Sequence, residues 1–299
     1  MKIAVLGLGL MGGAIALRLK GEGLDIVGWN RSPEKARDLA EQGVTTVRSA
    51  REAVQWSQVV ILVLRDVSAI TETLFSPKTG NIIKGRVVLQ MGTIAPEESR
   101  ELAKRVEVAG GEYLESPVLG SLPEAQEGRL ILMAGGERAL FERCLPVLQV
   151  IGERITLLGP HGAGYAAKIA QVVLCYLHSL ALSEALMLGV KGGVEVGQML
   201  SIIQNSTGKS YVADRYGPPI LNGDYDASFT LGLAHKDMKL AHDMARDLGI
   251  RLPMCELTTG TYARALDSYG FDANHLMAVR LLEEDNNTFL QACGRGTQQ

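Results

Sequence analysis

The sequence has few cysteines and no excess of charge of either sign, and both absences exclude classes of protein. Its 299 residues include 30 basic and 33 acidic side chains, which gives a formal net charge of −3. A chain so balanced has no electrostatic reason to bind nucleic acid or an anionic membrane surface. No Cys-x-x-Cys pair is present, and neither a disulfide framework nor a zinc site is predicted from Cys144, Cys175, Cys255 and Cys293. We therefore expect small-molecule chemistry in a reducing cytoplasm.

Metal-ligand spacing, internal repeats and low-complexity tracts are also missing. No metal is predicted, because no two histidines are spaced as in a metal site: His161, His178, His235, His242 and His275. Lys168, His178 and Glu184 interrupt the longest apolar segment before the roughly 18 residues that a membrane span needs. Glycines break the apolar region near the N-terminus, which argues against a signal peptide. The length instead suits two domains, followed by a short polar tail (294–299) that we expect to be mobile.

A glycine-rich turn lies close to the start of the chain, between a short apolar run and a helix-compatible segment. The turn reads Gly7-Leu8-Gly9-Leu10-Met11-Gly12. In such a turn Gly7 permits the tight change of direction, Gly9 lets the backbone approach a pyrophosphate, and Gly12 lets the helix pack on the strand. The amide N-terminus of the helix then favours the pyrophosphate anion. This stretch predicts a dinucleotide-binding fold.

The first half of the chain alternates short apolar runs with helix-compatible segments. The expected strands after the first are at 25–30, 59–64, 87–91, 113–115 and 130–134. This alternation is typical of a parallel, doubly wound sheet, to which we expect some antiparallel strands to be added at the end.

The second half is predicted to be helical throughout. A helix is expected from residue 163 to about 188, and further helices at 196–204, 234–248, 257–268 and 275–284. The fold class is therefore α/β: a Rossmann domain at 1–162 and an all-α domain at 163–299, joined by the long helix. Apolar residues on most faces of that helix imply burial between domains or subunits, so we expect a homodimer or homotetramer.

The residues after the second expected strand favour NADP(H) over NAD(H). In NAD-selective folds an acidic residue at this place binds the ribose 2′-hydroxyl, whereas this chain has Asn30, Arg31 and Ser32. Arg31 can form charge-assisted hydrogen bonds with a 2′-phosphate and stack on adenine, and Ser32 can donate another hydrogen bond. The alternative is that Arg31 is solvated and Ser32 caps the next helix, and Ser32 can serve both purposes.

Lys168 is the candidate proton donor. It follows small residues in Gly162-Ala-Gly-Tyr-Ala-Ala-Lys168, just past the expected domain boundary, and clefts between domains commonly bind ligands. Hydride transfer to a carbonyl needs a proton at the oxygen, and a partly desolvated lysine is suited to provide it. Taken alone, a lysine on a helix is more often a solvated surface residue.

Motifs along nearly the whole chain resemble one family. They are the turn at 7–12, Met91-Gly-Thr-Ile94, Ser116-Pro-Val-Leu-Gly-Ser121, the segment 162–168 and Lys236-Asp-Met-Lys-Leu-Ala241. Together they are similar to the β-hydroxyacid dehydrogenases, which include 3-hydroxyisobutyrate dehydrogenases, tartronate semialdehyde reductases and glyoxylate/succinic semialdehyde reductases. The resemblance implies hydride transfer between NADP(H) and a small hydroxy acid, semialdehyde or keto acid.

The resemblance also implies roles for individual residues. Lys168 becomes the catalytic lysine, Leu64 and Thr93 line the cofactor site, and Lys236 approaches the nicotinamide. A substrate carboxylate is expected at Leu119, Gly120 and Ser121, through backbone N–H groups and the serine hydroxyl. The alternatives are an ordinary turn at 119–121 and an exposed charged pair at Lys236 and Asp237.

Two positions depart from the family pattern. The usual substrate-binding serine falls at Leu119, and the asparagine expected four residues after the lysine falls at Val172. Both changes remove a polar group from the expected pocket, which favours substrates other than compact acids. Two other readings therefore remain open: an imine-reductase-like NADPH enzyme and a non-catalytic NADPH-binding protein.

Overall fold

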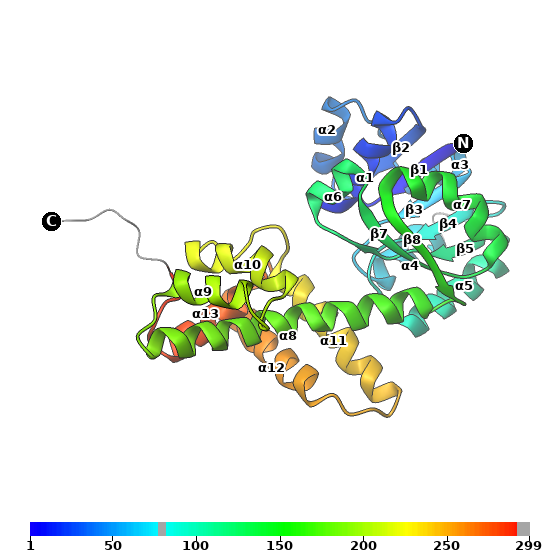
Figure 1. The fold of residues 1–299 in the computed structure, drawn as a ribbon. Helices are drawn as coiled ribbons and strands as arrows, with labels where there is room; N and C mark the ends of the chain where they lie inside the picture. The colour runs from blue at the N-terminus through cyan, green and yellow to red at the C-terminus, as the bar shows by residue number, and fades with distance from the viewer. Residues whose placement is uncertain (77–81, 292–299) are drawn as a thin grey trace. The chain divides into compact units, whose positions relative to one another are not determined.

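The chain divides into two compact units, Met1–Lys168 and Ile169–Gln299 (Figure 1). A computed structural model describes residues 1–76 and 82–291 of the chain. The sequence placed the domain boundary after residue 162, whereas the units divide after Lys168, inside the long helix α8 (Ala163–Lys191).

Unit 1 is built on a mixed sheet with the strand order β2-β1-β3-β4-β5-β7-β6, and β8 pairs with β7. Its strands are β1 (Lys2–Leu6), β2 (Asp25–Trp29), β3 (Val59–Leu62), β4 (Val87–Gln90), β5 (Glu112–Glu115), β6 (Val118–Leu119), β7 (Leu130–Gly135) and β8 (Gly152–Gly159). The pairs from β2 through β5 are parallel, whereas β7 runs antiparallel to β5 and β6. The predicted parallel sheet with antiparallel strands at its end is confirmed.

Helices cover both faces of this sheet (Figure 1). They are α1 (Leu10–Gly21), α2 (Pro33–Glu41), α3 (Ala50–Trp56), α4 (Val67–Phe75), α5 (Pro96–Val108), α6 (Leu122–Glu127) and α7 (Arg138–Ile151). Along β1, Ile3 and Val5 pack into one core with α1 and α7, while Ala4 and Leu6 pack into the other with α3, α4 and α5. Because successive strand residues point to opposite faces and both faces are covered, the strand is apolar throughout.

Unit 2 is helical in its described part, as the sequence predicted. Its helices after α8 are α9 (Val196–Gln204), α10 (Tyr211–Asn222), α11 (Leu231–Asp247), α12 (Pro253–Tyr269) and α13 (Met277–Asp285). One apolar core combines residues of four helices, namely Leu186 of α8, Leu200 of α9, Val212 of α10 and Val279 of α13.

Helix α8 corrects one expectation from the sequence. By length and composition it could cross a membrane, since an 18-residue window reaches a mean hydropathy of 1.6. Every 18-residue window of α8 contains Lys168 or Glu184, but so few charges leave the mean hydropathy high, and Gln171 and His178 carry polar groups without a fixed charge. We interpret α8 as a core helix, because Tyr165 belongs to a core of unit 1 and Leu186 to the core of unit 2.

Candidate active site

A cleft of about 640 Å³ lies in unit 1 at the carboxyl ends of β1, β2 and β3. In open α/β sheets this edge is where nucleotides bind. Several predicted cofactor residues line it: Gly7, Gly9, Asn30, Arg31, Ser32 and Leu64. Leu8 is buried in the core, and Leu10, Met11 and Gly12 begin helix α1.

The three glycines of the turn are required for different reasons. Gly7 has a φ of +100°, and a Cβ there would lie 2.3 Å from the Val63 carbonyl oxygen. A Cβ on Gly12 would lie 1.8 Å from the Gly7 carbonyl oxygen, so α1 packs on the turn only with glycine at this position. At Gly9, the N-cap residue of α1, no heavy atom lies within 4 Å of such a Cβ. Packing therefore leaves the space at Gly9 open to a ligand, which fits a pyrophosphate at the helix N-terminus.

Asn30 joins the glycine turn to the end of β2. Its Oδ1 accepts a hydrogen bond from the Leu8 N–H at 2.9 Å, and its Nδ2 donates to the Ser32 carbonyl at 3.1 Å. The side chain at the place of the ribose-binding acid thus also holds the turn in position.

Cations surround the open side of the cleft. Among the residues that the structure describes, five basic side chains line it, namely Arg31, Lys35, Arg48, Arg51 and Arg65, against one acid, Glu72. Arg31 Nη1 lies 3.5 Å from Glu72 Oε2, but both side chains are about 70% exposed, so water screens this pair. Ser32 is the N-cap residue of α2, as predicted, yet its side chain forms no capping hydrogen bond. The cleft therefore suits a ligand with several negative charges.

The loops after β3 and β4 carry Leu64 and Thr93 and lie in close contact. A Cβ on Gly92 would lie 2.3 Å from the Leu64 carbonyl oxygen. Tyr165, buried at the start of α8, donates a hydrogen bond to the Gly92 carbonyl at 2.9 Å. Burial raises the pKa of Tyr165, so its hydroxyl stays a proton donor. This tyrosine is part of the 162–168 segment, but no role was predicted for it from the sequence.

The structure brings the predicted catalytic lysine next to the predicted substrate segment. Lys168 Nζ donates a hydrogen bond to the Val118 carbonyl at 2.8 Å, and Val118 is followed by Leu119 at the end of β6. The lysine side chain is partly buried. The lysine predicted to donate the proton and the 119–121 turn thus share one small region of unit 1.

Glu115 positions the start of α8, and the sequence reasoning missed it. Its carboxylate is fully buried and accepts hydrogen bonds from the Gly162 N–H at 2.7 Å and the Gly164 N–H at 2.8 Å. The Ser99 hydroxyl donates to the same carboxylate. Backbone donors at a helix N-terminus stabilise a buried negative charge. The available signal was an acid that ends a strand directly after two buried residues, Tyr113 and Leu114.

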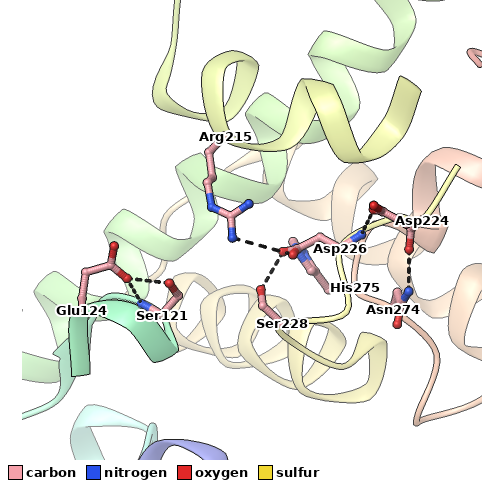
Figure 2. Close-up of polar contacts among 8 residues, drawn as sticks. All are labelled: Ser121, Glu124, Arg215, Asp224, Asp226, Ser228, Asn274 and His275. Carbon is pink, nitrogen blue, oxygen red and sulfur yellow. Dashed lines mark hydrogen bonds and ion pairs between the residues drawn. The ribbon is translucent and has the colours of Figure 1, made fainter. Parts of the chain in front are cut away.

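The hydroxyl and N–H of Ser121 are already engaged within the chain (Figure 2). Ser121 Oγ donates to Glu124 Oε2 at 2.5 Å, and the Ser121 N–H donates to the same oxygen at 2.8 Å. The hydrogen bond from the Ser121 hydroxyl is the main cause that lowers the pKa of Glu124. Of the donors expected to hold a substrate carboxylate at 119–121, the two of Ser121 therefore hold the carboxylate of Glu124. The Ser-x-x-Glu spacing of a capping box was the signal for this contact.

Lys236 and Asp237 lie on α11 in unit 2. Lys236 Nζ is 3.3 Å from Asp237 Oδ1, but Asp237 is only 4% exposed. The alternative of an exposed charged pair is therefore wrong. Val172 is buried on α8, four residues after Lys168 and hence on the same side of the helix. At this position the chain has an apolar group where the family pattern has an amide.

The loop that leads into α11 is held by a buried His–Asp pair (Figure 2). His275 Nε2 lies 2.8 Å from Asp226 Oδ2, and the Ser228 hydroxyl donates to the same oxygen at 2.7 Å. Burial alone would raise the pKa of Asp226, but these hydrogen bonds lower it to about 2. Asp226 thus stays ionised while it holds an unusual backbone conformation, with a φ of +54°.

No group of three potential metal ligands occurs among the residues that the structure describes. No disulfide joins Cys144, Cys175 and Cys255, and Cys293 and the tail 294–299 lie outside the described residues.

Family profiles and relatives cover almost the whole chain. The NAD-binding domain of 6-phosphogluconate dehydrogenase matches residues 2–159, and the NAD-binding domain of NADP-dependent 3-hydroxyisobutyrate dehydrogenase matches residues 162–282. The 2-hydroxy-3-oxopropionate reductase of Escherichia coli is 30% identical over 95% of this chain and 97% of its own length. The 3-hydroxyisobutyrate dehydrogenase of Pseudomonas aeruginosa is 31% identical over 87% of this chain and 91% of its own length.

Solved structures share the fold. The 3-hydroxyisobutyrate dehydrogenase of Mycobacterium tuberculosis has a TM-score of 0.83 at 28% identity, covering 94% of this chain and 98% of that one. An imine reductase from Myxococcus stipitatus reaches a TM-score of 0.66 at 19% identity, which shows a common fold alone. The chain therefore belongs to the β-hydroxyacid dehydrogenase family and is a pyridine-nucleotide-binding oxidoreductase that acts on CH–OH groups.

Proposed function

We propose that this enzyme catalyses the reversible, NADP(H)-dependent reduction of an aldehyde or keto group on a small acid. The observation that carries the proposal is the hydrogen bond from Lys168 Nζ to the Val118 carbonyl, which holds a proton donor beside the 119–121 turn. The relatives named above act on compounds of this class.

The residues of the cleft fit NADP(H). The open space at Gly9 suits the pyrophosphate, and Arg31 and Ser32 suit the 2′-phosphate, with further basic side chains around them. Bound NADPH supplies the hydride. Leu64 and Thr93 are assigned to the cofactor site, and Lys236 to the nicotinamide end.

Lys168 supplies the proton in this proposal. As the carbonyl carbon receives hydride, its oxygen becomes an alkoxide, and the lysine ammonium donates a proton to that oxygen. In the reverse direction the neutral amine accepts the proton from the alcohol. Glu115 and Tyr165 are positioning residues, since they fix the start of α8 and the loop that carries Thr93.

Assembly and location complete the proposal. Exposed apolar side chains on α8, such as Leu174 at 52% and Leu188 at 77% exposure, support a surface for a second copy of the chain. We propose a cytoplasmic homodimer or homotetramer. Light scattering at micromolar concentration should give twice or four times the chain mass, and a monomeric mass would contradict it.

NADPH consumption against semialdehydes, glyoxylate, keto acids and cyclic imines tests the reaction. We expect turnover of at least one carbonyl acid. Turnover of imines alone would favour the imine-reductase-like alternative. Tight NADPH binding without any turnover would favour a non-catalytic NADPH-binding protein. Lys168 argues against both alternatives, because neither needs a proton-donating lysine at this place.

A further inference from the structure

The turn that follows β6 contains its own carboxylate. In unit 1 a single oxygen of Glu124 accepts hydrogen bonds from both the N–H and the hydroxyl of Ser121. The residue two positions earlier, Leu119, has no polar side chain. The turn therefore has fewer donors to offer an incoming anion than its backbone path suggests.

A substrate carboxylate at this turn would meet Glu124 directly. To reach the Ser121 donors, it must either displace Glu124 Oε2 or lie against it. Two carboxylates that share one set of donors cannot both stay ionised without a large penalty, because like charges at this distance disfavour the ionised form. The hydrogen bonds to Ser121 also make Glu124 the harder of the two to protonate.

How near a substrate carboxylate lies to the reacting carbonyl decides whether Glu124 affects it. Lys168 Nζ, the proposed proton donor, lies 2.8 Å from the Val118 carbonyl, and only Leu119 and Gly120 separate Val118 from Ser121 in the sequence. A carbonyl held at Lys168 thus brings its nearest substituents close to the turn, whereas groups further along the substrate can lie elsewhere.

We propose that Glu124 is a specificity-determining residue that excludes a carboxylate directly attached to the reacting carbonyl. The substrate class is then a semialdehyde or ketone in which at least one carbon separates the carboxylate from the carbonyl, rather than a 2-oxo acid. This inference rests on the proposed function, since it takes the reacting carbonyl to lie at Lys168.

Two substrates of similar size isolate the effect of the charge. Glyoxylate carries a carboxylate beside its aldehyde, and glycolaldehyde carries a neutral hydroxymethyl group at the same place. Glu124→Gln keeps an oxygen that can accept from Ser121 and removes only the charge. We expect Glu124→Gln to raise kcat/KM for glyoxylate by about tenfold, mainly through a lower KM. For glycolaldehyde, kcat/KM should change by less than about twofold.

Glu127→Gln is the matched control. Glu127 is an exposed glutamate of the same helix, and it pairs with Arg129. Its substitution should therefore leave kcat/KM unchanged for both substrates. If Glu124 acted only as a helix cap, its substitution would alter both substrates alike. An equal change for the two substrates, or no change for glyoxylate, overturns the proposal.

A binding measurement separates this inference from the proposed function. Oxamate is an unreactive acid of the size of glyoxylate, and calorimetry can measure its binding to the NADP⁺ complex. We expect Glu124→Gln to bind oxamate about tenfold more tightly than the unchanged enzyme. Equal affinities overturn the role of Glu124 even where turnover is normal. If no carbonyl compound is reduced by either protein, the proposed function fails, and oxamate affinity still decides the role of Glu124.

Discussion

The cofactor cleft and the region of Val118 and the 119–121 turn are built in different ways. The cleft is formed by the backbone at Gly7, Gly9 and Gly12, and cationic side chains line its open side. At the turn, side chains contact partners of the same chain, as Lys168 does with Val118 and Ser121 with Glu124. A backbone site tolerates few changes, because added atoms collide with the main chain. A side-chain site can change its specificity through one substitution and leave the fold intact.

The largest expected effect on activity comes from the lysine that lies beside the 119–121 turn. Lys168→Ala should lower kcat by about 10² to 10⁴, the usual contribution of a positioned proton donor, and leave NADPH affinity nearly unchanged. Steady-state kinetics and NADPH titration measure the two quantities. Lys104→Ala, which removes an exposed lysine of α5, serves as the control. Near-normal turnover of Lys168→Ala would show that the proton comes from another group.

Two glycine substitutions compare packing with ligand binding in the cleft. Gly12→Ala forces a Cβ to within 1.8 Å of the Gly7 carbonyl oxygen, so we expect a loss of about 3 kcal/mol or more of stability. Gly9→Ala meets no atom within 4 Å and should leave the thermal midpoint nearly unchanged while it weakens NADPH binding about tenfold or more. Thermal unfolding and calorimetry check both. Unchanged cofactor affinity in Gly9→Ala would remove Gly9 from the site.

Arg31 tests the choice of cofactor. NADPH should bind more tightly than NADH by about 1.5 to 3 kcal/mol, the scale of one or two charge-assisted hydrogen bonds, and Arg31→Ala should abolish most of this difference. Arg37→Ala, at an exposed arginine of the nearby helix α2, should leave this difference in affinity unchanged. Equal dissociation constants for the two cofactors in the unchanged enzyme would refute the NADP(H) assignment.

The smallest effect comes from restoring the family pattern at the pocket. Leu119→Ser together with Val172→Asn should raise kcat/KM for small acids about tenfold, because about 1.4 kcal/mol of recovered transition-state binding corresponds to that factor. Efficient reduction of glyoxylate by the unchanged enzyme, with no gain in the double variant, would mean that other groups hold the carboxylate. Adding Glu124→Gln to the double variant then shows whether the charge of Glu124 or the missing polar groups at Leu119 and Val172 limit activity on small acids more strongly.

The fold class of unit 1 could be predicted from the sequence, because the patterns that indicate it are local. The glycine turn, the apolar strands and the positions of Asn30, Arg31 and Ser32 can each be recognised within a few residues. Their geometry follows from steric limits on the backbone, which hold wherever such a stretch folds. The missed helices have short or proline-containing segments, which give weak periodicity: α3, α4, α6, α7 and α10.

Only the tertiary structure revealed what positions the chemical groups. Glu115 meets Gly162 across 47 residues, and Tyr165 meets Gly92 across 73, so no spacing along the chain announces either contact. The bond from Lys168 to Val118 spans 50 residues and likewise depends on how the start of α8 packs against β6. The sequence by itself determined which groups are present and which backbone turns they favour. Folding decided which donor meets which acceptor, because a hydrogen bond requires both atoms within about 3 Å, and only packing of distant segments brings them there.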